Sequence, residues 1–158
     1  MKILMCLVLI AVCLQCIAES DNTIAYNIVN NTPYIVDGIG RGYTGCVVKQ
    51  TSAIKVLPHS TNTLMITYGT YSECLTYDSS VSDWEFEIKN DQPGNRFNLN
   101  YNPNNRTTQT CPITADGYSC FVNNNTKQAY KFLLIESTLR SPYLTQTIEA
   151  NQLTINQK

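Results

Sequence analysis

The sequence predicts an all-β protein, an antiparallel β-sandwich of about 8–10 short strands. In residues 83–89, Trp84, Phe86 and Ile88 alternate with charged residues, which is typical of a strand with one buried face. Short runs rich in β-branched and aromatic residues are bounded by Asn, Gly, Pro or Ser. After the first 18 residues, no window of a dozen residues carries an apolar stripe at helical spacing. These patterns favour a sandwich or barrel over an α/β fold, and we expect a sandwich.

The clearest supersecondary unit is a hairpin. Phe97, Leu99 and Tyr101 alternate with asparagines, and residues 91–95 between the two runs (Asp-Gln-Pro-Gly-Asn) supply turn-forming side chains. The Gly-rich residues 38–45 lack the G-x-G-x-x-G spacing of a phosphate-binding turn, so we expect a flexible loop there. Residues 143–148 are a candidate edge strand, and the last several residues are expected to fray. Further strands are expected at residues 23–30, 34–37, 53–57, 63–68, 73–77, 118–122 and 128–136.

Residues 1–18 have the pattern of a secretory signal peptide. Lys2 precedes an almost unbroken apolar run, and the small residues Cys16 and Ala18 suit cleavage before Glu19. The run is shorter than the roughly 20 residues that a membrane-spanning helix needs. We therefore expect residues 19–158 to form one secreted, extracellular domain, without a transmembrane anchor in the mature chain.

Charge excludes some partners. Removing residues 1–18 from the 158 leaves 140, and the loss of Lys2 leaves ten basic and twelve acidic side chains, a formal charge of −2. These charges are spread along the chain without blocks. We expect no nucleic acid as a partner and no electrostatic attachment to an anionic membrane.

The cysteine count suits an oxidising compartment. Three of the seven cysteines leave with the signal peptide, and four remain, which predicts two disulfides. Cys111 and Cys120 bracket a turn and are expected to pair, which leaves Cys46 for Cys74, although three connectivities are possible. Each bridge would stabilise the fold by roughly 2–4 kcal/mol. The sequence has no C-x-x-C motif and a single histidine, so we expect neither metal nor cofactor.

Three N-x-[ST] sequons are candidate glycosylation sites: Asn30, Asn105 and Asn124. All three lie beside predicted turns. Asn105 and Asn124 are the better candidates, because Pro33 directly follows the sequon of Asn30 and is expected to hinder its glycosylation.

Candidate catalytic groups are few, so we expect no enzymatic activity. His59 lies among turn-forming residues next to Ser60, and a solvated loop histidine is the simpler interpretation. Glu85 and Glu87 stand roughly 7 Å apart on one strand face, as a glycosidase carboxylate pair would, but strand alternation explains them without catalysis.

Tyrosine is unusually frequent, with ten residues against one tryptophan. Tyr43, Tyr68, Tyr71 and Tyr118 fall at strand ends or in loops and form our candidate ligand surface. Such rings can stack on sugars, bind a choline group or anchor a protein partner. The simpler interpretation is that most are strand residues with a buried ring and a solvated hydroxyl.

Three segments of residues 24–101 recur in a recognisable order: Ile28-Val29-Asn30-Asn31-Thr32, Ile54-Lys55-Val56-Leu57-Pro58-His59 and Trp84-Glu85-Phe86-Glu87-Ile88, followed by Pro93, Asn95 and Phe97-Asn98-Leu99. This order of elements resembles the cytolysin and lectin β-sandwich group, which includes actinoporins and aegerolysins. The resemblance implies recognition of lipid head groups or glycans through loop aromatics. Actinoporins also carry an amphipathic helix before the sandwich and an aromatic-rich proline loop, and neither is expected here.

The sequence thus favours a secreted binding protein that recognises a carbohydrate, a lipid head group or a cell-surface protein. The alternative is a structural or adhesive extracellular protein that self-associates through sheet edges or tyrosine-bearing loops. A membrane-active cytolysin, or a small hydrolase using His59 or the pair of Glu85 and Glu87, is a more distant alternative.

Overall fold

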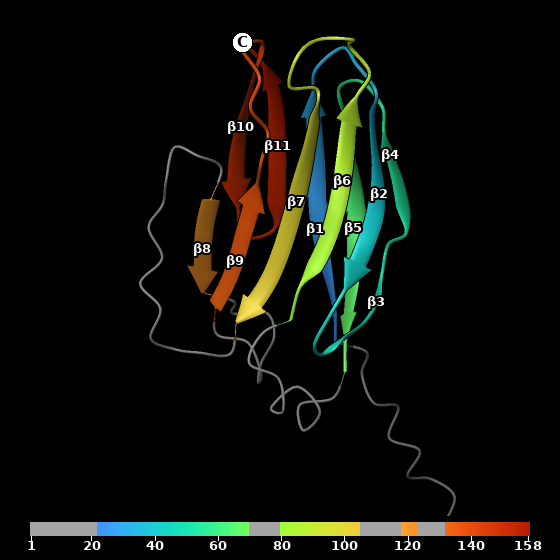
Figure 1. Ribbon diagram of the computed structural model, residues 1–158, viewed down its shortest axis with the longest axis vertical. Coiled ribbons are helices and arrows are strands. Elements are labelled where there is room, and N and C mark those ends of the chain that lie inside the picture. The colour runs from blue at the N-terminus through green and yellow to red at the C-terminus, as the bar shows by residue number, and fades with distance from the viewer. Residues whose placement is uncertain (1–21, 70–79, 105–117, 123–131) are drawn as a thin grey trace, which may run out of the picture.

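Two β-sheets make up the described part of this protein (Figure 1). The computed structural model describes residues 22–69, 80–104, 118–122 and 132–158, and only the backbone of residues 22, 103–104, 118–122 and 132–134. All eleven elements in these ranges are strands, which confirms the all-β prediction. The strands are β1 (Asn22–Asn31), β2 (Val36–Tyr43), β3 (Val47–Gln50), β4 (Ala53–Val56), β5 (Ser60–Tyr68), β6 (Ser82–Ile88), β7 (Arg96–Asn104), β8 (Tyr118–Val122), β9 (Phe132–Ser137), β10 (Leu144–Glu149) and β11 (Gln152–Gln157).

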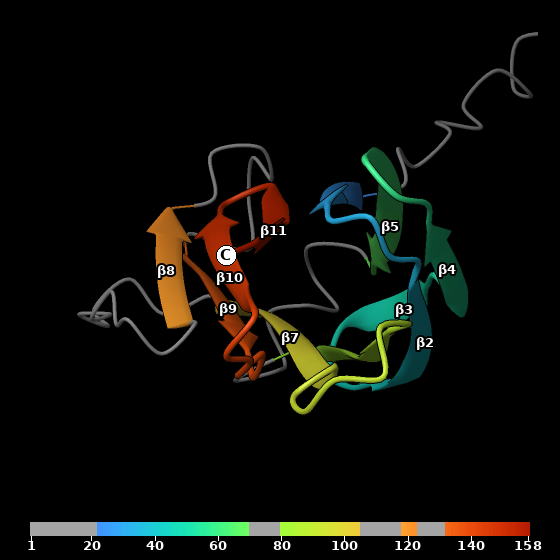
Figure 2. The ribbon, with the colours of Figure 1, turned by 90° about the horizontal axis from the view of Figure 1, so that it is seen from above.

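The first sheet, sheet A, has five strands in the order β10-β11-β1-β5-β3. The second, sheet B, has six strands in the order β4-β2-β6-β7-β9-β8. Figure 2 shows the two layers end-on, with β4 next to β5 along one side and β8 next to β10 along the other. All pairings are antiparallel except that of β1 with β11, which is parallel. The arrangement is consistent with a β-sandwich.

Strand alternation builds the core between the sheets, as the period-2 patterns predict. Aromatic rings fill its centre. The rings of Phe86 and Phe97 stack with centroids 5.1 Å apart, and Tyr26 of sheet A meets Tyr101 of sheet B edge-to-face at 5.4 Å. The largest fully buried side chains are Trp84, Tyr26, Tyr101, Phe86, Ile28, Leu64, Ile66, Ile88, Leu99, Ile135, Leu153 and Ile155.

The predicted hairpin is confirmed. Strands β6 and β7 pair antiparallel, with Phe86 opposite Phe97. Asp91 and Gly94 in the connecting turn have positive φ angles of 52° and 73°. A side chain at Gly94 would also collide with the backbone carbonyl of Arg140, so this turn packs against the loop after β9 and requires a glycine.

The C-terminal segment differs from the prediction. Residues 144–149 form β10 at the edge of sheet A, as expected for the 143–148 candidate. The expected fraying of the last residues is wrong, because β11 lies between β10 and β1. Its Leu153 and Ile155 are fully buried. The segment is therefore part of the core and raises the strand number above the expected 8–10.

The Gly-rich residues 38–43 belong to a strand, not to the predicted loop. They form most of β2, with a shift in register between Gly40 and Gly42 where the strand pairs with β6. A side chain at Gly38 would overlap the ring of Phe86 and lie 2.7 Å from Ile54. Glycine is thus used for close packing against the core.

We expect Leu153→Ala to lower the free energy of unfolding by about 2–5 kcal/mol, because it opens a cavity at a fully buried position of a central strand. Thr145→Ala, on the exposed face of β10, is the control and should change it by at most about 0.5 kcal/mol. Urea denaturation followed by tryptophan fluorescence measures both. Equal and small effects would show that the C-terminal strand does not stabilise the fold.

Candidate binding surface

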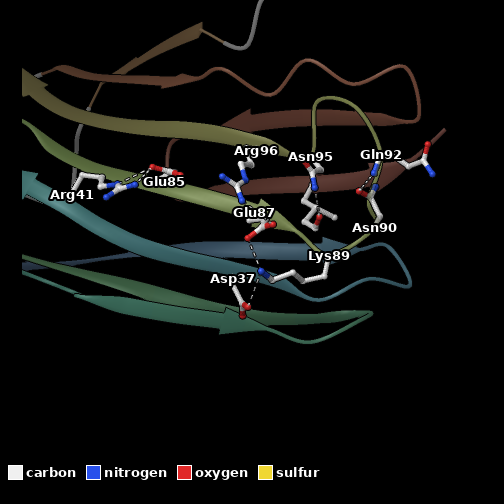
Figure 3. Close-up of polar contacts among 10 residues, drawn as sticks. Asp37, Arg41, Glu85, Glu87, Lys89, Asn90, Gln92, Asn95 and Arg96 are labelled. Atoms are coloured by element: carbon white, nitrogen blue, oxygen red, sulfur yellow. Dashed lines mark hydrogen bonds and ion pairs between the residues drawn. The ribbon is translucent and has the colours of Figure 1, made fainter.

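The outer face of sheet B is charged, and six of its charged residues form ion pairs (Figure 3). The Lys89 ammonium lies 2.5 Å from Glu87 and 3.9 Å from Asp37. On the other side of Glu87, Arg96 Nη2 donates a hydrogen bond of 3.4 Å to Oε1. Arg41 forms a separate ion pair, in which its Nε donates to Glu85 Oε2 at 2.8 Å. Arg41, Lys89 and Arg96 are therefore engaged with the carboxylates of Asp37, Glu85 and Glu87.

These contacts involve Glu85 and Glu87, the two strand carboxylates whose spacing resembles that of a glycosidase pair. A hydrogen bond from Lys89 is the main cause that lowers the pKa of Glu87, and the charge of Arg96 lowers it further. A general acid needs a raised pKa instead. Glu85 is held by Arg41. The arrangement suits a surface ion-pair row, with Glu87 ionised at neutral pH.

The outer face of sheet A has a different chemistry. We call the outward residues of β10, β11, β1 and β5 the polar face. Seven of its fifteen residues are threonines, and only Glu149 is charged. Its members, in strand order, are Thr145, Thr147 and Glu149; Gln152, Thr154 and Asn156; Thr23, Ala25, Asn27, Val29 and Asn31; Thr61, Thr63, Met65 and Thr67.

Hydrogen bonds between neighbouring strands hold this face in place. Thr63 Oγ1 donates to Asn27 Oδ1 at 2.9 Å, between β5 and β1. Asn31 Nδ2 donates to Asn156 Oδ1 at 2.9 Å, between β1 and β11. Because each hydroxyl or amide has more hydrogen-bonding capacity than one bond uses, the face retains donors and acceptors for a ligand.

Aliphatic side chains lie within the polar face. Met65 is 46% exposed and stands opposite Ala25 on β1. Val29 stands opposite Thr61 on β5 and Thr154 on β11. The face thus combines neutral hydrogen-bonding groups with small apolar surfaces. It was not identified from the sequence, although the alternating threonines and asparagines of these strands are its sequence signal.

The predicted tyrosine surface is not assembled by the described residues. Tyr43 is 47% exposed at the end of β2. Tyr68 is only 3% exposed, because strand alternation places it on the inner face of β5 with Leu64 and Ile66. Tyr68 is therefore a core residue and must be removed from the candidate surface. Tyr71 and the side chain of Tyr118 lie outside the described residues.

His59 and Ser60 do not form a nucleophile and base pair in this structure. His59 is an exposed turn residue with a φ of 52°, and its backbone N–H donates to the Thr32 carbonyl at 3.3 Å. The hydroxyl of Ser60 donates to the Leu57 carbonyl at 2.8 Å. The Ser60 proton is thus committed to the backbone of the turn.

Asn30 has an unexpected environment for a predicted glycosylation site. Asn30 is 0% exposed. Its Nδ2 donates to the backbone carbonyls of Tyr34 at 2.7 Å, Leu57 at 3.0 Å and Val56 at 3.4 Å. Its Oδ1 accepts from the backbone N–H of Thr32 at 3.1 Å and from the Thr32 hydroxyl at 2.7 Å. We call these contacts the Asn30 network.

The Asn30 network joins the two sheets. Asn30 lies near the end of β1 in sheet A, whereas Val56 ends β4 in sheet B and Tyr34 precedes β2 of sheet B. These segments meet at the upper end of the molecule in Figure 1. The network therefore satisfies the buried polar groups where the chain crosses between the layers.

The remaining predicted sites are only partly described. Cys46 is buried, 3% exposed. The side chains of Cys74, Cys111 and Cys120 lie outside the described residues, as do Asn105 and Asn124. The expected signal peptide, residues 1–18, also lies outside them.

Within the described ranges, no cluster of three or more His, Cys, Asp and Glu side chains is placed to hold a metal ion. The same ranges contain no helix long and apolar enough to cross a membrane.

On sheet B, one buried oxygen of the Asp83 carboxyl group, Oδ1, lacks a hydrogen-bond partner among the described residues. Burial raises the pKa of the Asp83 carboxyl above its ordinary value of 3.8. The folded protein therefore binds this proton more tightly than the unfolded chain does. Stability falls as the pH rises from about 3.8 through the raised pKa of Asp83, and above that pKa the loss stays constant.

Comparison with known proteins found no match: no protein-family model, no curated protein and no solved structure matches this chain.

We expect Asp83→Asn to raise the melting temperature at neutral pH, because it removes a charge that burial disfavours. The gain should disappear below about pH 3.8, where Asp83 is protonated in both states. Thermal unfolding at several pH values measures this. Asp91→Asn, at an exposed turn position, is the control for the change in net charge. A pH-independent difference, or a lower melting temperature at neutral pH, would contradict the burial argument.

Proposed function

We propose that this protein is a secreted, non-catalytic binding protein whose polar face recognises a neutral glycan. In this proposal residues 1–18 are removed as a signal peptide, and residues 19–158 act in the extracellular space. Disulfides join Cys46 to Cys74 and Cys111 to Cys120, and N-linked glycans are attached to Asn105 and Asn124.

The observation that carries the proposal is the nearly uncharged, hydrogen-bonding character of the polar face. A neutral glycan presents hydroxyl groups that both donate and accept hydrogen bonds, and threonine, asparagine and glutamine complement them. Sugar rings also expose C–H surfaces, which suit aliphatic contacts such as Met65 and Val29. The bonds between Asn27 and Thr63 and between Asn31 and Asn156 preorganise the face, which lowers the entropic cost of binding.

Charge and hydrophobicity favour a glycan over the other two expected ligand classes, a lipid head group and a cell-surface protein. An anionic lipid head group needs available cations, but Arg41, Lys89 and Arg96 on sheet B are paired with Glu85, Glu87 or Asp37. Among the described residues this leaves Lys55 on β4 as the exposed cation of sheet B outside these ion pairs. Stable protein interfaces usually centre on large apolar or aromatic anchors. Met65 is the only exposed large hydrophobic residue on the polar face.

The polar face can be tested with a pair of charge insertions. Thr154→Lys places an ammonium near the middle of the polar face, where binding would bury it without a partner. We expect it to weaken glycan binding at least about tenfold, a loss of about 1.4 kcal/mol. Asn98→Lys adds the same charge on the exposed face of sheet B and should leave affinity unchanged. A glycan array identifies the ligand, and isothermal titration compares the variants.

Liposomes with neutral and with anionic head groups form the second arm of this experiment. The proposal fails if the folded protein binds no glycan on the array. It also fails if Asn98→Lys and Thr154→Lys weaken binding equally. Binding to liposomes alone would replace the glycan with a lipid ligand.

A further inference from the structure

The Asn30 network uses the same amide nitrogen that N-glycosylation of its sequon would modify. Asn30-Asn31-Thr32 is an acceptor sequence for N-glycosylation. In the folded protein, however, the two N–H groups of the Asn30 amide are shared among three carbonyl oxygens, and the residue is fully buried. The sequon is therefore part of the core, whereas glycosylated asparagines belong to the surface.

Glycosylation would destroy this arrangement. In the transfer, Asn30 Nδ2 forms a bond to the anomeric carbon of a lipid-linked oligosaccharide, loses one hydrogen as a proton, and the lipid diphosphate leaves with the electrons of the broken carbon–oxygen bond. The modified nitrogen keeps a single N–H, which cannot serve the carbonyls of Tyr34, Val56 and Leu57. A hydrophilic glycan would also have to occupy the space between the end of β1 and the end of β4.

Folding alone does not prevent this reaction, because the transfer takes place on chain that is still entering the secretory compartment. Protection must therefore reside in the local sequence. Pro33 follows Thr32, the last residue of the sequon, and is exposed in the structure. Its ring restricts the backbone of Thr32 to extended conformations and removes one backbone N–H. These restrictions act on the unfolded chain as well as on the folded protein.

We propose that Pro33 keeps Asn30 unglycosylated, so that its amide remains free to join the two sheets. The sequon then persists for a structural reason. Asn30 supplies the donors of the network, and the Thr32 hydroxyl both donates to Asn30 Oδ1 at 2.7 Å and accepts from the Tyr34 backbone N–H at 3.2 Å. This inference rests on the secretory route of the proposed function and is independent of the polar face.

The experiment expresses residues 19–158 behind a heterologous signal sequence in a eukaryotic host, as the natural chain and as Pro33→Ala. The foreign signal ensures that the chain meets the glycosylation machinery even if residues 1–18 do not direct secretion. Enzymatic deglycosylation in heavy-oxygen water marks each formerly glycosylated asparagine, and peptide mass spectrometry reads it. We expect Asn30 to be unmodified in the natural chain and glycosylated in Pro33→Ala, with a marked loss of secreted, folded protein.

Production of Pro33→Ala in a bacterial periplasm without N-glycosylation is the matched control. There it should fold as the natural chain does, which separates the effect of the glycan from that of the proline ring. A glycan on Asn30 of the natural, folded chain would overturn the inference. An unmodified Asn30 in Pro33→Ala would remove the protective role of Pro33. Normal secretion of glycosylated Pro33→Ala would show that the network tolerates the modification.

Discussion

The arrangement of the two sheets depends on the buried amide of Asn30, which lies where the end of β1 in sheet A meets the end of β4 in sheet B. Five hydrogen bonds converge on this single side chain, three from its nitrogen and two to its oxygen. Without Asn30 the backbone carbonyls of Tyr34, Val56 and Leu57 would each lose a donor, although Leu57 also accepts from Ser60 and Tyr34 from Thr32. A buried polar group that is left unsatisfied costs about 1–3 kcal/mol. A neutral amide is required, because these acceptors need donors and a charge would be expensive to bury.

With the layers joined in this way, core packing determines the side chains of the inner faces. The outer faces are not constrained by the core and differ in their chemistry. Sheet B carries ion pairs centred on Glu85 and Glu87, whereas sheet A carries a nearly uncharged field of threonine and amide side chains. The two faces would interact with different partners, since paired charges favour solvent and neutral hydroxyls favour a hydroxyl-bearing ligand. The proposed glycan site follows from this asymmetry.

Local patterns were sufficient to predict the all-β class and the β6–β7 hairpin, because alternation around Trp84 and the turn before Arg96 are encoded in adjacent residues. They were insufficient for β11, whose parallel partner β1 lies more than a hundred residues earlier. The burial of Tyr68 and of Asn30 could not be inferred either. A tyrosine at a strand end and an asparagine in a sequon suit a surface equally well, and only the packing of distant segments decides.

The most direct test of the account compares Asn30→Asp with Asn31→Asp. Both add one carboxyl group, but Asn30 is buried and Asn31 is exposed beside Asn156. Urea unfolding at neutral pH should show a loss of about 3–5 kcal/mol for Asn30→Asp, because it removes the donors and buries an uncompensated charge. Asn31→Asp should cost at most about 1 kcal/mol. Similar small losses for both variants would contradict the claim that the Asn30 amide joins the two sheets.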